Sequence, residues 1–275
     1  MASSNFNFSS LLGGGSTTTL NKTLNKLSDS FARLATGSRL TKASADPAGI
    51  AIAAALESVV VQVGQATRNV ADATSAVSIA DSASEQVQGL NVRLQELAAQ
   101  SANGTLSDGN RAALQAEFSA ITQEIQRIAD TTEFNGTKLL DGSSISVQVG
   151  VDSSSNSSLN VGGLNVKQLA QSLASQNIGT QSGAQAAIDA TQTFADSLTS
   201  QRSSALGAAQ ARLDSIDSSL RAKSQTDQEA LSRIRDVDYA AEIATATALK
   251  IRAEVSTALV AQSNLNANVV KSLLS

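Results

Sequence analysis

Residues 52–101 read IAAALESVVVQVGQATRNVADATSAVSIADSASEQVQGLNVRLQELAAQS, and their apolar and small side chains recur on alternating steps of four and three residues. A spacing of about 3.5 residues keeps one stripe of a helix facing a partner, so the pattern predicts one long helix that packs along its whole length. At 1.5 Å per residue this helix would be roughly 75 Å long, and it needs other long helices beside it. The stripe consists of Ile52, Leu56, Val59, Val63, Ala66, Val70, Ala73, Val77, Ala80, Ser84, Val87, Asn91, Leu94, Ala98 and Ser101.

A second row of apolar residues, Ile79, Ala83, Leu90 and Leu97, runs beside the first. Because alanine supplies many of the contact positions, neighbouring helices can approach closely on more than one face. We therefore expect a multi-helix bundle rather than an isolated pair of helices. In a chain that assembles with copies of itself, the second row is a candidate for contacts between subunits.

The composition excludes most catalytic chemistry. The 275 residues include no Cys, His or Trp and a single Pro, and only 3% are aromatic. Without His and Cys the chain lacks the commonest general base, metal ligand and thiolate nucleophile, so we predict no catalytic residue, no cofactor and no metal site. Asp214 and Asp217 have no accompanying base or ligand cluster, and we interpret them as part of a solvated helix face. A net charge of -4 gives no sign of a general attraction to nucleic acid or to an anionic membrane.

The amino end, MASSNFNFSSLLGGGSTTT (residues 1–19), is rich in Ser, Asn and Gly and is expected to be a flexible leader. Its three consecutive glycines are not a phosphate-binding loop, because no strand precedes them and no Lys follows. The leader lacks the basic region and apolar run of a cleaved signal peptide, and we expect no stretch of about 18 apolar residues that would span a bilayer. These features alone would assign the chain to the cytoplasm.

Residues 20–37 form the first predicted amphipathic helix, for which Gly37 is a suitable C-cap. A helix of this length is marginal alone in water, and because its polar face is only weakly basic, a partner helix is favoured over a membrane surface. The long helix is expected to begin with Asp46 as the N-cap and Pro47 at the first helical position. The apolar face of the first helix carries Leu20, Leu24, Leu27, Phe31 and Leu34.

The middle of the chain predicts a helical turn followed by a β-hairpin. Asn-Gly and Asp-Gly pairs within residues 101–109 mark a turn, after which a second helix of roughly twenty residues folds back on the first. From residue 145 apolar and polar residues alternate, and a polar loop at 152–158 separates this run from a second short one. A small β-hairpin is therefore predicted at about 144–162. The second helix is marked by Leu114, Phe118, Ile121, Ile125 and Ile128.

The carboxyl part of the chain returns to helix. Residues 164–183 carry only a weak apolar pattern, and no element is assigned to them. A helix is predicted from Ala184 to about residue 223, and a last one over about 231–275. The predicted fold is mainly α, a long antiparallel coiled-coil-like bundle in the shape of a rod, with one small β-hairpin. The last helix is marked by Ile234, Val237, Ala241, Ala244, Ala248, Ile251, Val255, Ala258, Gln262, Leu265 and Val269.

Several separated blocks of this sequence closely resemble bacterial flagellin. On the amino side they are LNKLSDSFARLATGSRLTKASADPAGIAIA (24–53), ELAAQSANGTLSD (96–108) and EIQRIADTTEFNGTKLLDG (124–142). On the carboxyl side they are SRIRDVDYAAEIA (232–244) and AQSNLNANVVKSLLS (261–275). The resemblance implies a structural protein that polymerises into the helical flagellar filament for swimming, and not an enzyme. It suggests a short form that lacks the variable outer domains of longer flagellins.

The resemblance also implies a domain organisation, partners and a location. Residues 1–40 and 231–275 would form an inner helical core, and residues 41–230 an outer core with the hairpin. The partners would be copies of the same chain, an export chaperone, and the junction and cap proteins, without nucleic acid and without membrane insertion. The subunit would pass unfolded through the flagellar export apparatus without a cleaved signal peptide, so the expected location becomes the extracellular filament.

Two alternatives remain beside the filament subunit. The hook-filament junction protein and other axial components share this architecture, although FNGTKLLDG (134–142) and the carboxyl ending favour flagellin. Flagellins with proteolytic insertions carry a zinc motif that requires His, which this chain does not contain.

The resemblance implies two sets of site residues. Arg93, Leu97 and Glu117 correspond to residues through which flagellins bind Toll-like receptor 5, and the spacing of Arg93 and Leu97 places them on one helix face, in a surface that assembly would cover. The alternative interpretation is a filament contact. The polymerisation helices are marked by Leu20, Leu24, Leu27, Phe31, Leu34, Ile251, Val255, Leu265 and Val269.

Overall fold

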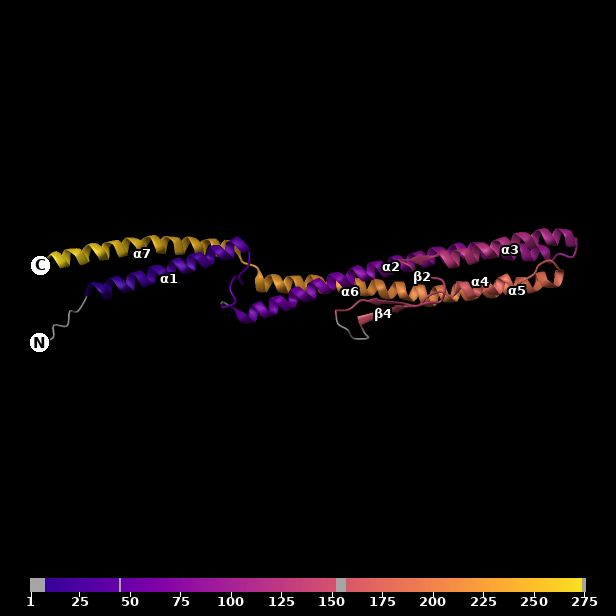
Figure 1. Cartoon of the computed structure of the whole chain (residues 1–275), viewed down its shortest axis with the longest axis horizontal. Helices are drawn as coiled ribbons and strands as arrows, with labels where there is room; N and C mark the ends of the chain where they lie inside the picture. Colours follow the sequence, from indigo (N-terminus) through magenta and orange to yellow (C-terminus); the bar gives the residue numbers. More distant parts are fainter. Residues whose placement is uncertain (1–7, 45, 152–156, 274–275) are drawn as a thin grey trace. The chain divides into compact units, whose positions relative to one another are not determined.

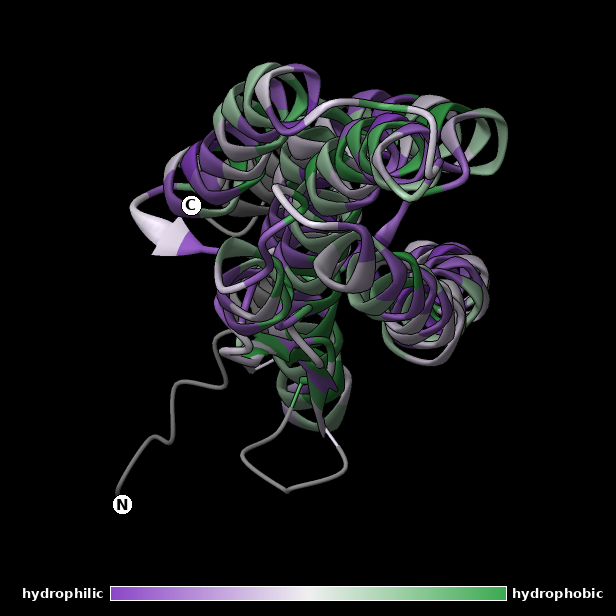
Figure 2. Ribbon diagram, turned by 90° about the vertical axis from the view of Figure 1, so that its right-hand side faces the viewer, coloured by the Kyte–Doolittle hydropathy of each residue, from purple (hydrophilic) through white to green (hydrophobic). Residues whose placement is uncertain are grey.

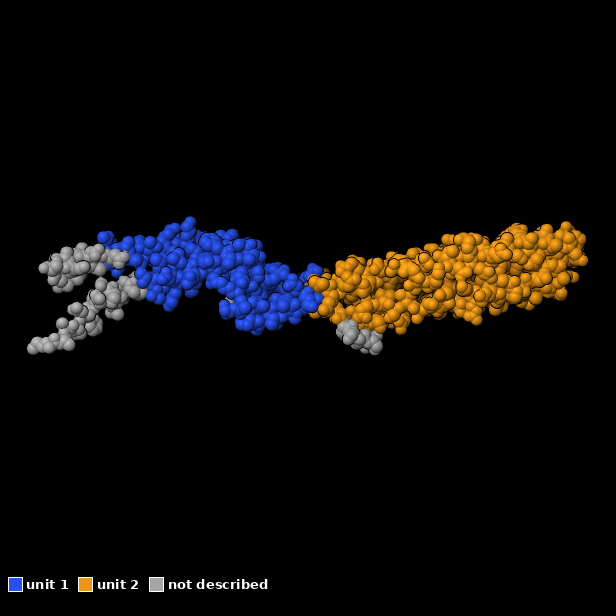
Figure 3. All heavy atoms as spheres, viewed as in Figure 1, with its two compact units in different colours: residues 1–58, 226–275 blue, residues 59–225 orange. Residues whose placement is uncertain are grey.

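The computed structural model describes residues 8–44, 46–151 and 157–273. The chain divides into two compact units (Figure 3). The terminal unit comprises residues 1–58 and 226–275, and the central unit comprises residues 59–225. Hydrophobic and hydrophilic residues are mixed along the helices, as Figure 2 shows.

Long helices make up most of the central unit, and two small antiparallel hairpins accompany them (Figure 1). This arrangement confirms the predicted fold class. The elements that lie in it wholly or in part are α2 (Pro47–Ser101), α3 (Asp108–Thr131), β1 (Glu133–Phe134), β2 (Thr137–Lys138), β3 (Ile145–Gln148), β4 (Ser158–Val161), α4 (Val166–Ala174), α5 (Gln181–Gln201), the π-helical segment η2 (Arg202–Gly207) and α6 (Ala208–Arg235).

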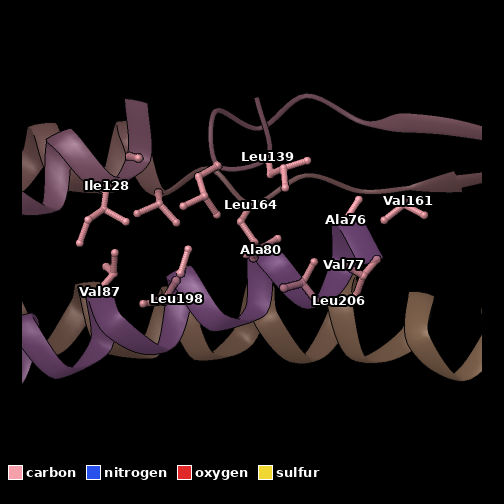
Figure 4. Packing of buried hydrophobic residues seen from close by; sticks show 14 of the residues in the cluster. Ala76, Val77, Ala80, Val87, Ile128, Leu139, Val161, Leu164, Leu198 and Leu206 are labelled. Carbon is pink, nitrogen blue, oxygen red and sulfur yellow. The ribbon is translucent and has the colours of Figure 1, made fainter. Parts of the chain in front are cut away.

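The predicted stripe of α2 is the centre of the core. Every stripe residue from Val63 to Ser101 is buried, whereas Ile52, near the start of the helix, is exposed. Figure 4 shows Val87 of α2 beside Leu198 of α5 and Ile128 of α3, so three helices contribute to one apolar cluster. The second row does not form an outer surface as a whole, because Ala83 and Leu97 are buried in the same cluster and only its first member, Ile79, is exposed.

The helix boundaries follow the predicted capping residues. The Asp46 carboxylate accepts the Gly49 backbone N–H at 2.8 Å, which confirms the N-cap of α2. The turn at 101–109 is also confirmed, and Ser107 caps α3 by accepting the Asn110 N–H. At the end of α2 the buried Arg111 guanidinium donates to the carbonyls of residues 101, 103 and 106. Arg111 thus satisfies carbonyl groups that a helix end leaves without intrahelical partners.

The predicted hairpin is confirmed as the antiparallel pair β3 and β4, with Ile145 opposite Val161 and Gln148 opposite Ser158. Regular pairing ends at Gln148, before the predicted end of the alternation, and residues 152–156 of the predicted polar loop lie outside the described residues. A second hairpin, β1 with β2, was not predicted. Its turn is Asn135-Gly136, both with positive φ, the backbone that an Asn-Gly pair favours between strands.

Residues 164–183, to which no element was assigned, contain α4. Asn165 caps this helix by accepting the Gln168 backbone N–H. Leu164, Val166 and Leu173 are fully buried, and the Ile178 backbone is held by Gln115 and Ser101 at 2.6 and 2.5 Å. The weak apolar pattern therefore belonged to a short helix whose stability comes from packing on α3.

The boundary of the last helix differs from the prediction. Helix continues from α5 through η2 and α6 as far as Arg235, so Ile234 belongs to α6. Val237 lies in the break before α7 (Tyr239–Leu273), where the Asp238 carboxylate accepts the N–H groups of residues 240 and 241. The spacing of apolar residues continues across this break, so it does not reveal where α7 begins. Asp238, a residue type that favours the N-cap, was the sequence signal for the start of α7.

The terminal unit pairs α1 (Phe8–Thr36) with α7, side by side and antiparallel (Figure 1). The predicted flexible leader is wrong for residues 8–19, which are helical, while residues 1–7 lie outside the described residues. Gly15, Thr17, Thr18 and Thr19 are exposed there, so the helix extends N-terminally from the paired part of α1 without burial of these residues. Gly37 ends α1 with φ 67°, as predicted for a C-cap.

One expectation about membranes was too strong. Within the part of the chain that the structure describes, α2 is long and apolar enough to cross a bilayer by length and composition, with a mean hydropathy of 1.6 over 18 residues. The expectation overlooked how many alanines and valines α2 contains. Only 11% of that 18-residue window is buried, so burial in the bundle core does not account for its apolar composition.

Candidate assembly surface

Large apolar side chains are exposed along both helices of the terminal unit. Phe31 of α1 is 53% exposed and Ile251 of α7 is 55% exposed. Contiguous exposed apolar surface on a soluble chain marks an interaction site. The exposed large apolar residues of this unit are Leu24, Phe31, Ile52, Tyr239, Ile243, Ile251, Val255, Leu259 and Leu265.

Each of the two helices has an inner and an outer apolar row. On α7 the inner row, Ala246, Leu249 and Ala253, is buried, and the exposed residues lie on a different face of the helix. On α1 the predicted stripe is split, since Leu20, Leu27 and Leu34 are half-buried whereas Leu24 and Phe31 are exposed. The predicted position Val269 lies in α7, but its side chain is outside the described residues. Pairing of α1 with α7 therefore leaves an apolar row of each helix uncovered.

An ion pair joins the two helices where α1 ends and α7 begins. The Arg33 guanidinium donates to the Glu242 carboxylate through Nε and Nη2 at 3.0 and 2.9 Å. Burial opposes ionisation of Glu242, but hydrogen bonds from Ser30 and Arg33 and the charge of Arg33 outweigh it, so the pKa of Glu242 lies below its ordinary value. Ser30 itself is fully buried beside this pair.

Backbone contacts close the same end of the helix pair. The Val237 N–H donates to the Gly37 carbonyl at 3.0 Å, and the Arg39 N–H donates to the Arg235 carbonyl at 2.6 Å. A Cβ added to Gly37 would lie 2.7 Å from the Tyr239 hydroxyl oxygen. Only glycine combines the positive φ found here with so close an approach of an aromatic side chain.

The proposed receptor residues are not equivalent in the structure. Arg93 is exposed and forms ion pairs with Glu117 of α3 at 2.7 Å and with Glu96 at 2.9 Å. These hydrogen bonds, first that of Glu117, raise the pKa of Arg93. Leu97 is completely buried, so the expectation that it shares an accessible surface with Arg93 is wrong. The four-residue spacing permits a shared face, but Leu97 belongs to the buried apolar cluster of the central unit.

The carboxylates singled out from the sequence belong to a solvated helix face. Asp217 pairs with Arg221 one turn later at 2.7 Å, and Asp214 accepts a hydrogen bond from Gln210. Across the described residues, no group of three or more His, Cys, Asp or Glu side chains is placed to hold a metal ion. The sequence pattern predicted neither the Arg33–Glu242 ion pair nor the contact between Gly37 and Tyr239. The available signal for the ion pair was a basic residue in the last turn of α1 and an acidic residue in the first turn of α7.

Two regions of the chain match one protein family. Residues 15–145 match the bacterial flagellin N-terminal helical region, and residues 188–274 match the bacterial flagellin C-terminal helical region. Flagellin of Halalkalibacterium halodurans is 36% identical over 91% of this chain and 93% of its own length. The flagellar filament 30.7 kDa core protein of Treponema maltophilum is 30% identical over 88% of this chain and 90% of its own length. The B-type flagellin of Pseudomonas aeruginosa matches over only 27% of its own length.

Solved structures give the same grouping. Bacillus cereus flagellin is 25% identical, with a TM-score of 0.50 over 56% of this chain and 88% of that one. A putative flagellar hook-associated protein from Vibrio parahaemolyticus has a TM-score of 0.58 over 70% of this chain, but at 14% identity this likeness concerns the fold alone. The family match therefore decides between the filament subunit and the other axial components. The chain belongs to the bacterial flagellins, the structural, non-enzymatic subunits of the extracellular flagellar filament.

Proposed function

We propose that the outer apolar rows of α1 and α7 are the surface through which this flagellin polymerises. The observation that carries the proposal is the exposure of Phe31 and Ile251 on helices that already bury their inner rows against each other. Full burial of one large apolar side chain contributes roughly 1.5–3 kcal/mol, so several such residues on each subunit supply a strong drive for assembly. A head-to-tail contact of this kind does not close and generates a helical polymer.

The domain roles follow from this proposal. Residues 1–40 and 231–275 would line the inside of the filament, where their apolar rows are removed from water. Residues 41–230 would surround them as the outer core with the β3–β4 hairpin. This assignment is supported by the different exposure of apolar residues in the two units.

The test is seeded elongation of filament fragments. A chain that lacks residues 1–40 and 236–275 is expected not to elongate the seeds, and Phe31→Ser with Ile251→Ser is expected to slow elongation strongly. Val92→Ser is the matched control, because Val92 of the central unit is 49% exposed. Normal elongation by the truncated chain, or an equal loss in the control, would contradict the proposal.

The resemblance to receptor-binding flagellins supports a second role for Arg93 and Glu117. Both lie at the α2–α3 surface, paired with each other, and a receptor would have to compete with that pair. Leu97 would act by holding α2 against α3 rather than by touching the receptor. Arg93→Ala is expected to reduce activation of Toll-like receptor 5, whereas Arg127→Ala, which breaks a pair within α3, leaves it unchanged. Equal activation by monomers and intact filaments would show that assembly does not cover this surface.

Export of the subunit is proposed to follow the flagellar route, unfolded and without cleavage. An export chaperone would hold the terminal helices, and junction and cap proteins would bind them at the two ends of the filament. Family membership supports this route. The intact mass of the subunit recovered from filaments is expected to include the amino-terminal residues, and a mass reduced by a leader would overturn the proposal.

A further inference from the structure

The apolar contact between α1 and α7 does not by itself define how the two helices are aligned. Its buried positions on α7, Ala246, Leu249 and Ala253, are small or repetitive, and the half-buried positions on α1 are the recurring leucines at 20, 27 and 34. A shift by one heptad moves one helix by roughly 10 Å and puts Ser256 or Glu242 at the position of the buried Leu249. The seam therefore favours the observed register mainly through one large side chain, and contacts beside it contribute the rest.

Polar groups at one end of the pair distinguish the observed register from its neighbours. Arg33 lies opposite Glu242, and the position one heptad later on α7 is Leu249. A shift in one direction would place the Arg33 charge against this buried leucine, and a shift in the other would carry Arg33 past Tyr239, the first residue of α7. Both arrangements cost free energy, because a partly buried charge that loses its partner is poorly solvated.

The helix termini reinforce the same alignment. Arg33 is in the last turn of α1 and Glu242 is in the first turn of α7, so each charge is favoured by the dipole of its own helix as well as by its partner. The Gly37 turn then brings the α1 end against Tyr239, with the Gly37 carbonyl bonded to the Val237 N–H. Charge, backbone and steric fit thus coincide within about two helical turns.

We propose that the register clamp formed by Ser30, Arg33, Gly37, Tyr239 and Glu242 aligns α1 with α7 and thereby sets the relative position of the two outer apolar rows. This inference rests on the proposed role of those rows in polymerisation. A subunit in a shifted register would present its exposed leucine, isoleucine and valine side chains about 10 Å out of step with its neighbours. The clamp residues are positioning residues, since they select which surface is presented without forming it.

Reversal of charge tests the clamp. Arg33→Glu and Glu242→Arg, each alone, are expected to raise the concentration needed for seeded elongation about tenfold, the equivalent of 1.4 kcal/mol. The double variant Arg33→Glu with Glu242→Arg restores the pair and is expected to recover most of the loss, but not all, because both charges then oppose their helix dipoles. Arg127→Glu is the control, as it places like charges at an exposed pair of the central unit and is expected to leave elongation unchanged.

Gly37→Ala is an independent variant of the same clamp. It leaves every charge in place but adds a Cβ at a positive φ beside the Tyr239 hydroxyl, and it is expected to impair elongation to a similar extent. Additive losses in the double charge variant, without recovery, would overturn the proposal. Unchanged elongation in the single charge variants, while Phe31→Ser with Ile251→Ser still slows elongation, would overturn it as well.

A distance measurement separates the clamp from the assembly surface. The natural sequence has no Cys, so spin labels on Lys26→Cys and Thr257→Cys, both exposed, report the α1–α7 alignment without background. The unaltered clamp is expected to give one distance, and the single charge variants a broadened distribution with populations displaced by roughly 10 Å. One unchanged distance in the single variants would contradict the clamp. A changed distance with normal elongation, together with normal elongation by Phe31→Ser and Ile251→Ser, would support the clamp while refuting the assembly surface.

Discussion

The helices of the two units of this flagellin share the same spacing of apolar residues, but the two units bury these residues to different extents. In the central unit the stripe of α2 packs in one apolar cluster with α3, α5 and the segment around the hairpins, and most leucine side chains of that unit are buried. In the terminal unit, α1 and α7 cover one face of each other, and large residues such as Phe31 and Ile251 remain exposed. The difference is the number of partners that the chain itself provides for each helix.

This comparison explains how one subunit can be both a stable chain and a building block. A helix with several partners completes its core within the chain, whereas a helix with one partner keeps an apolar face that another copy can cover. The charged clamp between Arg33 and Glu242 lies in the unit with the thinner core. In that unit polar contacts carry a larger share of the structural specificity.

The largest expected effect comes from truncation of one phenylalanine in each unit. Phe118 of α3 is 1% exposed, so Phe118→Ala is expected to lower the free energy of unfolding by about 4 kcal/mol through lost burial and a residual cavity. Phe31→Ala removes the same atoms from an exposed site and is expected to change the stability of the free chain by less than about 0.5 kcal/mol, while weakening filament elongation. Urea denaturation of the monomer and seeded elongation measure the two effects. Similar stability losses for both variants would remove the distinction between the units.

A smaller effect is expected at Asn91, a polar residue within the buried stripe of the central unit. Its side-chain N–H donates to the Thr191 carbonyl at 3.0 Å, but its buried Oδ1 has no hydrogen-bond partner among the described residues. Asn91→Leu is expected to raise the free energy of unfolding by about 1 kcal/mol, because a desolvated acceptor is replaced by apolar volume. Asn91→Asp is expected to lower it, since a carboxylate would be buried there. A stability loss on Asn91→Leu in urea denaturation would show that the Thr191 contact outweighs the unpaired oxygen.

The smallest effect concerns pH and the terminal unit. The folded-state pKa of Glu242 lies below its ordinary value of 4.5, so its contribution to helix pairing is present above that value and is lost as the pH falls through the lower folded-state pKa. We expect a loss of roughly 0.5 kcal/mol in α1–α7 pairing on acidification, because the partial exposure of Arg33 weakens the pair. The label distance between residues 26 and 257 followed from pH 6 to pH 3 measures it. Glu242→Gln is the control and is expected to flatten this part of the profile, and an unchanged profile in that variant would assign the effect to other groups.

Patterns that repeat along a helix were predictable, and single contacts were not. The stripe of α2, the Asp46 cap, the turn at 101–109 and the β3–β4 hairpin all follow from local periodicity or turn chemistry. The helix at residues 8–19 and α4 were missed because the local propensity of both is weak: residues 8–19 extend α1, and α4 is stabilised by packing against α3.

The same limit applies to the sites. Several exposed residues of α1 and α7 lie at positions that the heptad spacing predicts to be apolar. The spacing does not indicate which of these positions face the partner helix. Leu97 illustrates the error, since spacing placed it beside Arg93, whereas the structure buries it in the apolar cluster of the central unit. Arg33 and Glu242 are 209 residues apart, so their pairing has no local signature.

Amino-acid order alone therefore determined that this flagellin consists of long amphipathic helices with a small hairpin and no catalytic equipment, because helix and strand periods and missing residue types are local properties. The tertiary structure decided which apolar faces are covered within the chain, where α6 ends and α7 begins, and which charges meet at the clamp. Those features depend on which segments pack together, and a side chain is buried or exposed only through its neighbours in space.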